Sequence, residues 1–171
     1  AGFQELLEKG KFNIRLLARD SKKNRKKLSP YASDPRVTII WGDLTRYEDV
    51  LRGVEGADYV LHVGGMVSPA ADYYPEKTLK VNVTAAENIV KAILAQPNAS
   101  EIRTVYIGSV AQYGDRNPPC HWGGADEPQI PAKYDMYALS KIRAEAIFAN
   151  AGLKYWVSLR QSGILYPGIL K

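Results

Sequence analysis

The sequence is poor in the residues that build disulfides and metal sites. It contains one cysteine, Cys120, and two histidines among 171 residues. A single cysteine cannot form an internal disulfide, and so few cysteines and histidines leave no cluster with metal-ligand spacing. The sequence therefore predicts neither a disulfide framework nor a bound metal.

Long apolar runs are also absent. The longest, such as residues 59–66, are far shorter than the roughly 20 residues that a helix needs to cross a bilayer. The chain opens without the basic and then apolar leader of a secretory signal. We therefore expect no membrane partner and a cytoplasmic location.

The positive charge is concentrated in one place. The net charge is +5, and much of it lies in residues 22–27, Lys-Lys-Asn-Arg-Lys-Lys. This run fits a solvated loop or helix start, and it also fits contact with a cofactor phosphate. No aromatic residues alternate with these charges to stack on bases, so we expect no nucleic-acid partner.

The order of apolar patterns predicts an α/β fold. The length suits one domain, residues 1–171. Strand-like runs occupy residues 13–18, 37–41, 57–63, 102–107 and 155–160. Helical patterns occupy residues 5–9, closed by Gly10, and residues 45–53, 79–94 and 137–150. This alternation is typical of a parallel sheet covered by helices on both faces.

Two long loops mark the expected site. Residues 64–76 and 113–135 are rich in glycine, proline and tyrosine, and each follows a strand. Ligands of open α/β sheets bind outside the carboxyl ends of the strands, where such loops gather. Their aromatic pairs, Tyr73–Tyr74 and His121–Trp122, fit either a substrate pocket or exposed loop positions.

A tyrosine, a lysine and a serine suggest acid–base chemistry. Tyr137 and Lys141 are four residues apart on a predicted helix, so they lie on one face, one turn apart. A cation beside a phenol favours the phenolate and lowers the tyrosine pKa from about 10. Such a phenol can exchange a proton with a substrate hydroxyl near neutral pH. Ser109, at the end of an apolar run, would donate a hydrogen bond to the same oxygen.

Five segments in the right order resemble the extended short-chain dehydrogenase/reductase family, which includes NAD(P)-dependent sugar epimerases and dehydratases. They are Gly-Asp-Leu at 42–44, Val-Leu-His-Val-Gly-Gly at 60–65, Asn-Val-Thr-Ala-Ala-Glu-Asn at 82–88, residues 106–114 around Ser109, and residues 159–168. The resemblance implies a Rossmann-like doubly wound sheet that is incomplete at both ends. The family's first strand, its Gly-rich phosphate loop and its C-terminal substrate lobe have no counterpart in these residues.

The resemblance also implies roles for individual residues. Ser109, Tyr137, Lys141 and Asn82 correspond to the catalytic set, although Asn82 is equally suited to be a helix N-cap. Tyr137 and Lys141 would also contact the cofactor. The other implied cofactor contacts are Asp43, Leu44, His62, Val63, Gly64, Gln161 and Gly163. For Asp43 and Leu44 the alternative is a turn aspartate and a core leucine, and His62 fits a core histidine better than a catalytic one.

The first predicted strand ends with residues that bear on the cofactor. In this fold an acidic residue after the second family strand binds the ribose 2′-hydroxyl of NAD, whereas arginine accommodates the 2′-phosphate of NADP. Here Arg19 is followed by Asp20, with Lys22 and Lys23 close behind. Arg19 could hold a phosphate with two hydrogen bonds, so we favour NADP over NAD.

These observations predict an NAD(P)-dependent oxidoreductase or epimerase that acts on a small-molecule substrate, with a nucleotide sugar as one candidate. The alternative is a non-catalytic NADP-binding sensor on the same fold, since a fold does not fix a function. The family's habit of dimerising through two helices suggests a homodimer formed by the helices that begin near Leu79 and Tyr137.

Overall fold

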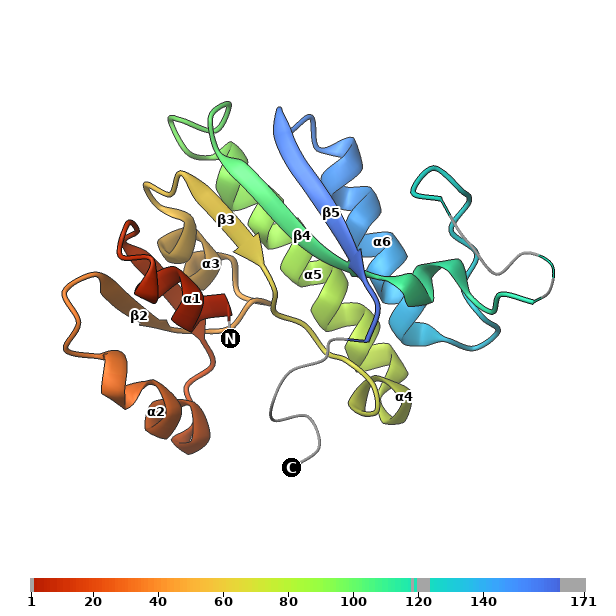
Figure 1. Ribbon diagram of the computed structural model, residues 1–171, viewed down its shortest axis with the longest axis horizontal. Helices are drawn as coiled ribbons and strands as arrows, with labels where there is room; N and C mark the ends of the chain where they lie inside the picture. Colours follow the sequence, from red (N-terminus) through yellow and green to blue (C-terminus); the bar gives the residue numbers. More distant parts are fainter. Residues whose placement is uncertain (1, 118, 120–123, 164–171) are drawn as a thin grey trace.

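The computed structural model describes residues 2–117, 119 and 124–163, and Figure 1 shows how helices and strands alternate along them. The elements are α1 (Gly2–Glu8), β1 (Ile14–Ala18), α2 (Lys22–Leu28), η1 (Ser29–Tyr31), β2 (Val37–Trp41), α3 (Tyr47–Val54), β3 (Tyr59–His62), α4 (Ala70–Tyr73), α5 (Pro75–Leu94), β4 (Arg103–Ser109), η2 (Val110–Tyr113), α6 (Met136–Asn150) and β5 (Tyr155–Gln161). The predicted α/β class is confirmed.

The strands form two parallel sheets. β1 pairs with β2, and β3, β4 and β5 pair in that order, with Ser109 opposite Gln161 at the end of β4 and β5. A doubly wound sheet has the strand order 3-2-1-4-5-6. The two sheets lie on either side of the place that the first strand holds in that order. This agrees with the resemblance, in which the family's first strand has no counterpart.

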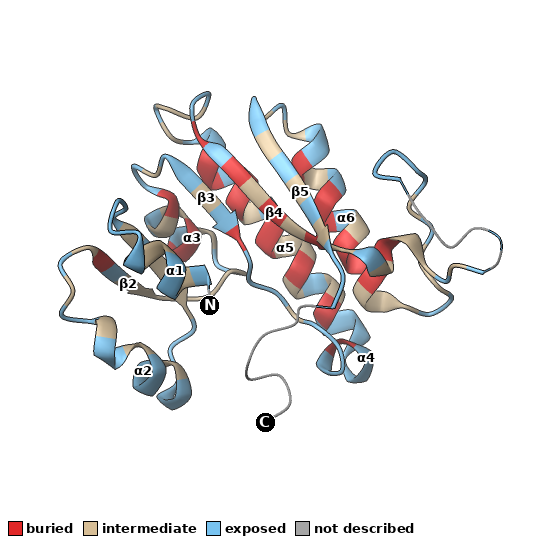
Figure 2. Cartoon of the chain, in the orientation of Figure 1, coloured by how far each residue is buried: buried red, intermediate tan, exposed pale blue. Residues whose placement is uncertain are grey.

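The core lies between the larger sheet and the helices α5 and α6, as the buried residues in Figure 2 show. β4 alternates, with Thr104, Tyr106 and Gly108 buried toward the helices and Val105 and Ile107 only half-buried on the other face. The largest fully buried side chains are those of Tyr106 and, on α6, Phe148, whose ring centres are 5.1 Å apart. The apolar stripe of α5 packs against α3 and α6 and completes this core.

The expectation of helices on both faces is wrong for β3–β5 within the described residues. The face away from α5 and α6 leaves apolar side chains exposed on the two outer strands: Tyr59 and Leu61 on β3, and Tyr155, Val157 and Leu159 on β5. The physical reason is the handedness of the crossovers. β3, β4 and β5 follow one another in one direction across the sheet, so right-handed connections place both crossover helices on the same face.

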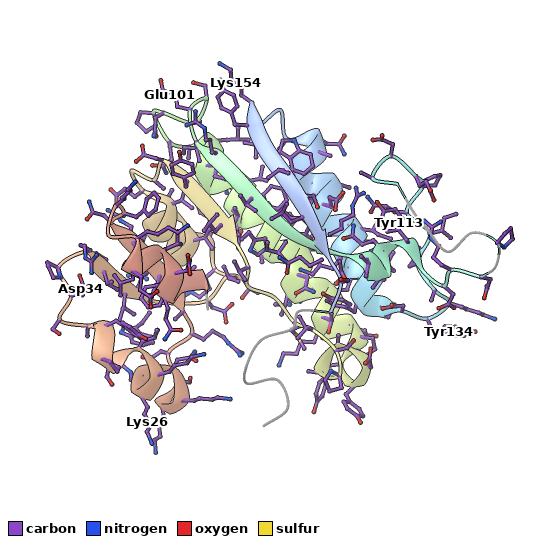
Figure 3. The ribbon with its side chains drawn as sticks, in the orientation of Figure 1. Lys26, Asp34, Glu101, Tyr113, Tyr134 and Lys154 are labelled. Carbon is purple, nitrogen blue, oxygen red and sulfur yellow. The ribbon has the colours of Figure 1, made fainter. Side chains whose placement is uncertain are left out.

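Local boundaries follow the sequence closely, with two differences. The helix predicted over residues 79–94 begins at Pro75 rather than residue 79, because proline suits the first turn of a helix. The loop predicted over residues 64–76 therefore ends earlier and contains the short helix α4. The basic run forms helix α2, where the backbone N–H of Asn24 donates to Oγ of Ser21 at 3.1 Å. Its lysines are exposed, and Lys26 points away from the rest of the protein in Figure 3.

None of the described helices combines the length and the apolar character that crossing a membrane requires.

Candidate active site at the carboxyl ends of the strands

The predicted catalytic residues gather at one edge of the larger sheet. Ser109 is the last residue of β4, and Gln161 ends β5 beside it. Helix α6 packs on β4 and η2, and its first turn carries Tyr137. Because the strands are parallel, α6 begins at the edge where they end, so it brings Tyr137 to the same side as Ser109.

Ser109 starts the turn that leads into η2. Its Oγ accepts a hydrogen bond from the backbone N–H of Ala111 at 3.2 Å, and its own N–H donates to Oε1 of Gln112 at 2.7 Å. These two bonds form a reciprocal cap. A hydroxyl that accepts one bond keeps its proton for another acceptor. Ser109 is half-buried, so its hydroxyl can donate to a substrate oxygen.

Tyr137 and Lys141 share one face of α6, as predicted. Tyr137 is half-buried, and Asp135 caps the helix by accepting from the N–H of Ala138 at 2.8 Å. Lys141 is only 5% exposed, and its Nζ donates to the carbonyl oxygen of Ile107 at 2.7 Å. The same Nζ lies 5.9 Å from the centre of the Tyr137 ring. Burial lowers the pKa of Lys141 to about 8, so it remains largely charged at neutral pH.

Asn82 ties the strand-end loop to the start of α6. It is buried in the middle of α5, so the interpretation of Asn82 as a helix N-cap is wrong. Its Oδ1 accepts from the N–H of Met66 at 2.7 Å, and its Nδ2 donates to Oγ of Ser140 at 2.8 Å. Ser140 in turn donates to the carbonyl oxygen of Tyr137 at 2.7 Å. A side chain on Gly65 would place its Cβ 2.9 Å from Asn82 Oδ1, so the loop approaches this amide closely.

Two of the predicted cofactor segments lie next to each other. A Cβ on Gly64, just beyond β3, would come within 2.6 Å of Cδ1 of Leu44, just beyond β2. Asp43 accepts from both N–H and Oγ1 of Thr45 at 2.8 Å, as a turn aspartate does. Gly64 and the preceding Val63 are exposed at the edge of the sheet.

His62 is directed into the core. It is 5% exposed and stacks near Tyr106 and Phe148, with ring centres 5.7 Å and 6.0 Å away. Burial, followed by the charge of Lys141, lowers its pKa to about 4. The imidazole is therefore neutral at physiological pH, and this position favours the core interpretation.

Arg19 and Asp20 follow β1 on the smaller sheet. Asp20 is held by Nε and Nη2 of Arg25 at 2.6 Å and 2.7 Å, and the Arg25 guanidinium lies 4.8 Å above the Trp41 ring. Arg19 is exposed. Asp20 is thus already paired with the Arg25 guanidinium, whereas the side chain of Arg19 is exposed to solvent.

The remaining predicted cofactor contacts are exposed to solvent. Gln161 and Gly163 are exposed beyond the core of β5. Cys120, His121 and Trp122, in the second long loop, lie outside the described residues. Nearby, a cavity of about 420 Å³ is lined by the described residues Tyr113, Arg116, Glu127, Pro131 and others. Figure 3 labels Tyr113 where η2 meets this loop.

The sequence analysis missed a buried carboxylate. Glu145 lies four residues after Lys141 and eight after Tyr137, so it continues their face of α6. It is 5% exposed and pairs with Arg160 of β5. The signal was present in the sequence, since a carboxylate on the buried face of a helix needs a partner.

The chain is similar to a known protein family and to several curated proteins. The model of the NAD dependent epimerase/dehydratase family matches residues 3–163. The UDP-glucose 4-epimerase of Rickettsia canadensis (strain McKiel) is 32% identical over 82 residues, which cover 47% of this chain and 24% of that protein. The 3 beta-hydroxysteroid dehydrogenase type 7 of Rattus norvegicus is 29% identical over 136 residues, covering 78% of this chain and 39% of that protein.

Solved structures share the fold. The enzyme WbmH of Bordetella bronchiseptica, in complex with NAD+, has a TM-score of 0.77 and 23% identity, covering 98% of this chain and 53% of that one. The UDP-glucose 4-epimerase of Thermus thermophilus, in complex with NAD, has a TM-score of 0.70 and 23% identity, covering 92% and 49%. The chain spans about half the length of these structures and less than half of the two curated relatives.

Proposed function

Because the chain belongs to the NAD dependent epimerase/dehydratase family, we propose that it forms the dinucleotide-binding part of an NAD(P)-dependent enzyme that acts on a nucleotide sugar. The observation that carries the proposal is the placement of Tyr137 and Lys141. Both lie on one face of α6, and α6 begins at the edge of the sheet where β4 ends in Ser109. Relatives described as UDP-glucose 4-epimerases support the substrate class.

The exposed strand ends fit a dinucleotide. A Cβ on Gly64 would lie 2.6 Å from Cδ1 of Leu44, and Gly64 is itself exposed, so bare backbone lies at the surface beside the Leu44 side chain. Bare backbone at the carboxyl ends of parallel strands is where this type of sheet binds its cofactor. In the proposal, Asp43, Leu44, Val63 and Gly64 line the cofactor, and Gln161 and Gly163 close the site from β5.

Each catalytic side chain has a separate task. Tyr137 exchanges a proton with the substrate hydroxyl, and Ser109 donates a hydrogen bond to the same oxygen. Lys141 uses one of its three N–H groups on Ile107, so two remain for the tyrosine phenolate and the cofactor ribose. The bound nicotinamide supplies the hydride chemistry. Asn82 binds Ser140, which in turn donates to the carbonyl oxygen of Tyr137. Asn82 thereby fixes the position of the first turn of α6, which carries Tyr137.

The proposed preference for NADP rests on the residues at the end of β1. Asp20 is paired with Arg25, whereas Arg19 is exposed and can bind a 2′-phosphate. This supports NADP, although the structural neighbours described with a cofactor hold NAD. Arg19→Ala should weaken NADPH binding about tenfold or more and leave NADH binding unchanged, because a charge-assisted hydrogen bond is lost. Equal effects on both cofactors, measured by nicotinamide fluorescence, would rule out this role for Arg19.

A hydroxysteroid is a second candidate substrate class, because one curated relative that covers more of this chain is a steroid dehydrogenase. The match to the 3 beta-hydroxysteroid dehydrogenase covers 78% of this chain, against 47% for the Rickettsia canadensis epimerase. Oxidation of a hydroxysteroid needs the same proton transfer by Tyr137 but releases the reduced cofactor instead of returning the hydride to the substrate. The two classes are therefore distinguished by whether reduced nicotinamide accumulates.

The test of the proposal is binding followed by turnover. The full-length protein is titrated with NADPH and NADH, and then assayed with UDP-glucose, UDP-galactose and a 3β-hydroxysteroid. Binding of a dinucleotide and interconversion of the two UDP-sugars are expected. Failure to bind either dinucleotide would refute the proposal, and turnover of the steroid alone would select the second class.

From the family resemblance we also infer a homodimer built from α5 and α6, and we keep the cytoplasmic location expected from the sequence as a proposal. Light scattering of the full-length protein after size exclusion tests the first inference, since a monomer mass would contradict it.

A further inference from the structure

Glu145 is the centre of a buried polar network that the catalytic roles above do not use. Its carboxylate accepts hydrogen bonds from Gln112 at 2.9 Å, Gln129 at 3.0 Å and Ser158 at 2.6 Å. Nη2 of Arg160 also donates to it, and Arg160 itself is largely covered. Donors from four side chains on one buried carboxylate make a satisfied network, which has one low-energy arrangement and is costly to disturb.

The network reaches the catalytic serine through one side chain. Gln112 is fully buried and donates through Nε2 to Glu145, while its Oε1 accepts from the N–H of Ser109 at 2.7 Å. The chain of contacts thus runs from α6, through one glutamine, to the backbone of the residue that holds the substrate oxygen.

Gly108 makes room for this arrangement. A Cβ at Gly108 would lie 2.7 Å from Oε1 of Gln112, 3.0 Å from Cγ of Arg160 and 3.0 Å from Oγ of Ser158. Three members of the network would be displaced by a single methyl group. The strand therefore needs glycine directly before Ser109, for packing rather than for an unusual backbone angle.

The network also anchors the second long loop. Arg160 donates through Nη1 to the hydroxyl of Tyr113 and to the carbonyl oxygen of Ala125 at 2.7 Å. Its guanidinium lies 5.3 Å from the centre of the Tyr113 ring. The loop that borders the 420 Å³ cavity is thereby attached to β5 and, through Glu145, to α6.

We propose that Glu145 and Gln112 are positioning residues that hold the Ser109 turn in register with the face of α6 that carries Tyr137 and Lys141. The inference deepens the proposed function and rests on it. Tyr137, Lys141 and Glu145 stand one turn apart on the same helix face, so a fixed distance from Glu145 to the Ser109 backbone also fixes Ser109 relative to the phenol. Neither residue touches the reacting atoms.

The experiment is a double-mutant cycle between Gln112→Met and Ser109→Ala. Methionine keeps the volume of glutamine and removes all three side-chain hydrogen bonds of Gln112, those with Ser109, Glu145 and Gln129. Gln96→Met is the matched control, because Gln96 also accepts from a backbone N–H, that of Gly56 at 3.3 Å, but at the opposite end of the sheet. The probes are UDP-glucose and UDP-galactose, with NADH and NADPH for binding.

Gln112→Met should lower kcat about tenfold, the value of one hydrogen bond, and leave cofactor affinity unchanged. In the Ser109→Ala background it should have almost no further effect on kcat, because it acts through Ser109. A further tenfold loss in that background would overturn the inference. Gln96→Met should change neither quantity.

Hydrogen exchange keeps the inference testable if Gln112→Met folds poorly or the probes are not turned over. The Ser109 amide should exchange faster in Gln112→Met and in Gly108→Ala, which would displace Oε1 of Gln112, but not in Gln96→Met. Unchanged exchange in both variants would refute the link between Gln112 and Ser109. Absence of dinucleotide binding by the wild-type protein would instead refute the proposed function.

Discussion

Replacing Lys141 by methionine should make the protein more stable at neutral pH while it abolishes turnover. Lys141 is 5% exposed, and its ammonium has one described hydrogen bond, to Ile107. A buried charge without an opposite charge beside it opposes folding. Methionine fills the same space without that cost. Lys141 thus lowers the stability of the fold and in return places a cation beside Tyr137.

The size of the effect follows from the pKa. Burial lowers the pKa of Lys141 from 10.5 to about 8. At about 1.36 kcal/mol per pH unit, a charged Lys141 costs the folded state about 3 kcal/mol at neutral pH. Methionine removes this cost but also the bond to Ile107, which is worth about 1–2 kcal/mol. The net gain is about 1–2 kcal/mol, or a rise in Tm of roughly 2–8 °C for a chain of this length.

The pH dependence gives the sharper test. Because the pKa of Lys141 is lower in the folded state, the unfolded state binds more protons between about pH 8 and pH 10.5. The cost is fully present below about pH 8 and disappears as the pH rises toward 10.5. The advantage of Lys141→Met should therefore shrink between about pH 7 and about pH 10.

Urea unfolding at several pH values measures this advantage directly. Lys80→Met is the matched control, since Lys80 is an exposed lysine on α5 and should change stability little at any pH. A Lys141→Met variant that is less stable than the wild type at pH 7, or an advantage independent of pH, would refute the reasoning.

The remaining predictions concern the core and the buried carboxylate. Phe148→Ala should lower the free energy of unfolding by about 3–5 kcal/mol, because it opens a cavity beside Tyr106 and Trp156; a loss below about 1 kcal/mol in urea unfolding would contradict the core assignment. Burial alone would raise the pKa of Glu145, but bonds from Arg160, Ser158 and Gln112 outweigh it and hold the pKa at about 2. The stability that Glu145 contributes is present above about pH 4.5 and lost as the pH falls toward 2, so Glu145→Gln should unfold with a weaker acid dependence than the wild type.

The sequence predicted the elements of the fold better than their assembly. Strand positions followed from runs such as residues 37–41, because β-branched and aromatic residues bounded by turn signals favour strands. The split into two sheets and the bare face of β3–β5 did not follow, because they depend on crossover direction and on which strand pairs with which. Local periodicity carries no information on either.

The candidate site was predicted where residues are close along the helix and missed where they meet across the fold. Tyr137 and Lys141 share a face by spacing alone, and the structure agrees. Gln112, Glu145 and Arg160 come from three elements, and their network became visible only with the tertiary contacts. Asn82 shows the converse, since one of its two interpretations from the sequence was a helix N-cap, whereas it lies two turns inside α5.

The most direct test of the central claim compares Tyr137→Phe with the wild-type, full-length protein. The variant lacks only the phenolic oxygen of a half-buried side chain, so folding and the affinity for NADPH or NADH should be nearly unchanged. We predict that turnover of the UDP-sugars or of the steroid falls by at least about a hundredfold, as expected for the loss of a general acid–base. Full activity in a Tyr137→Phe variant that binds the dinucleotide would contradict the account.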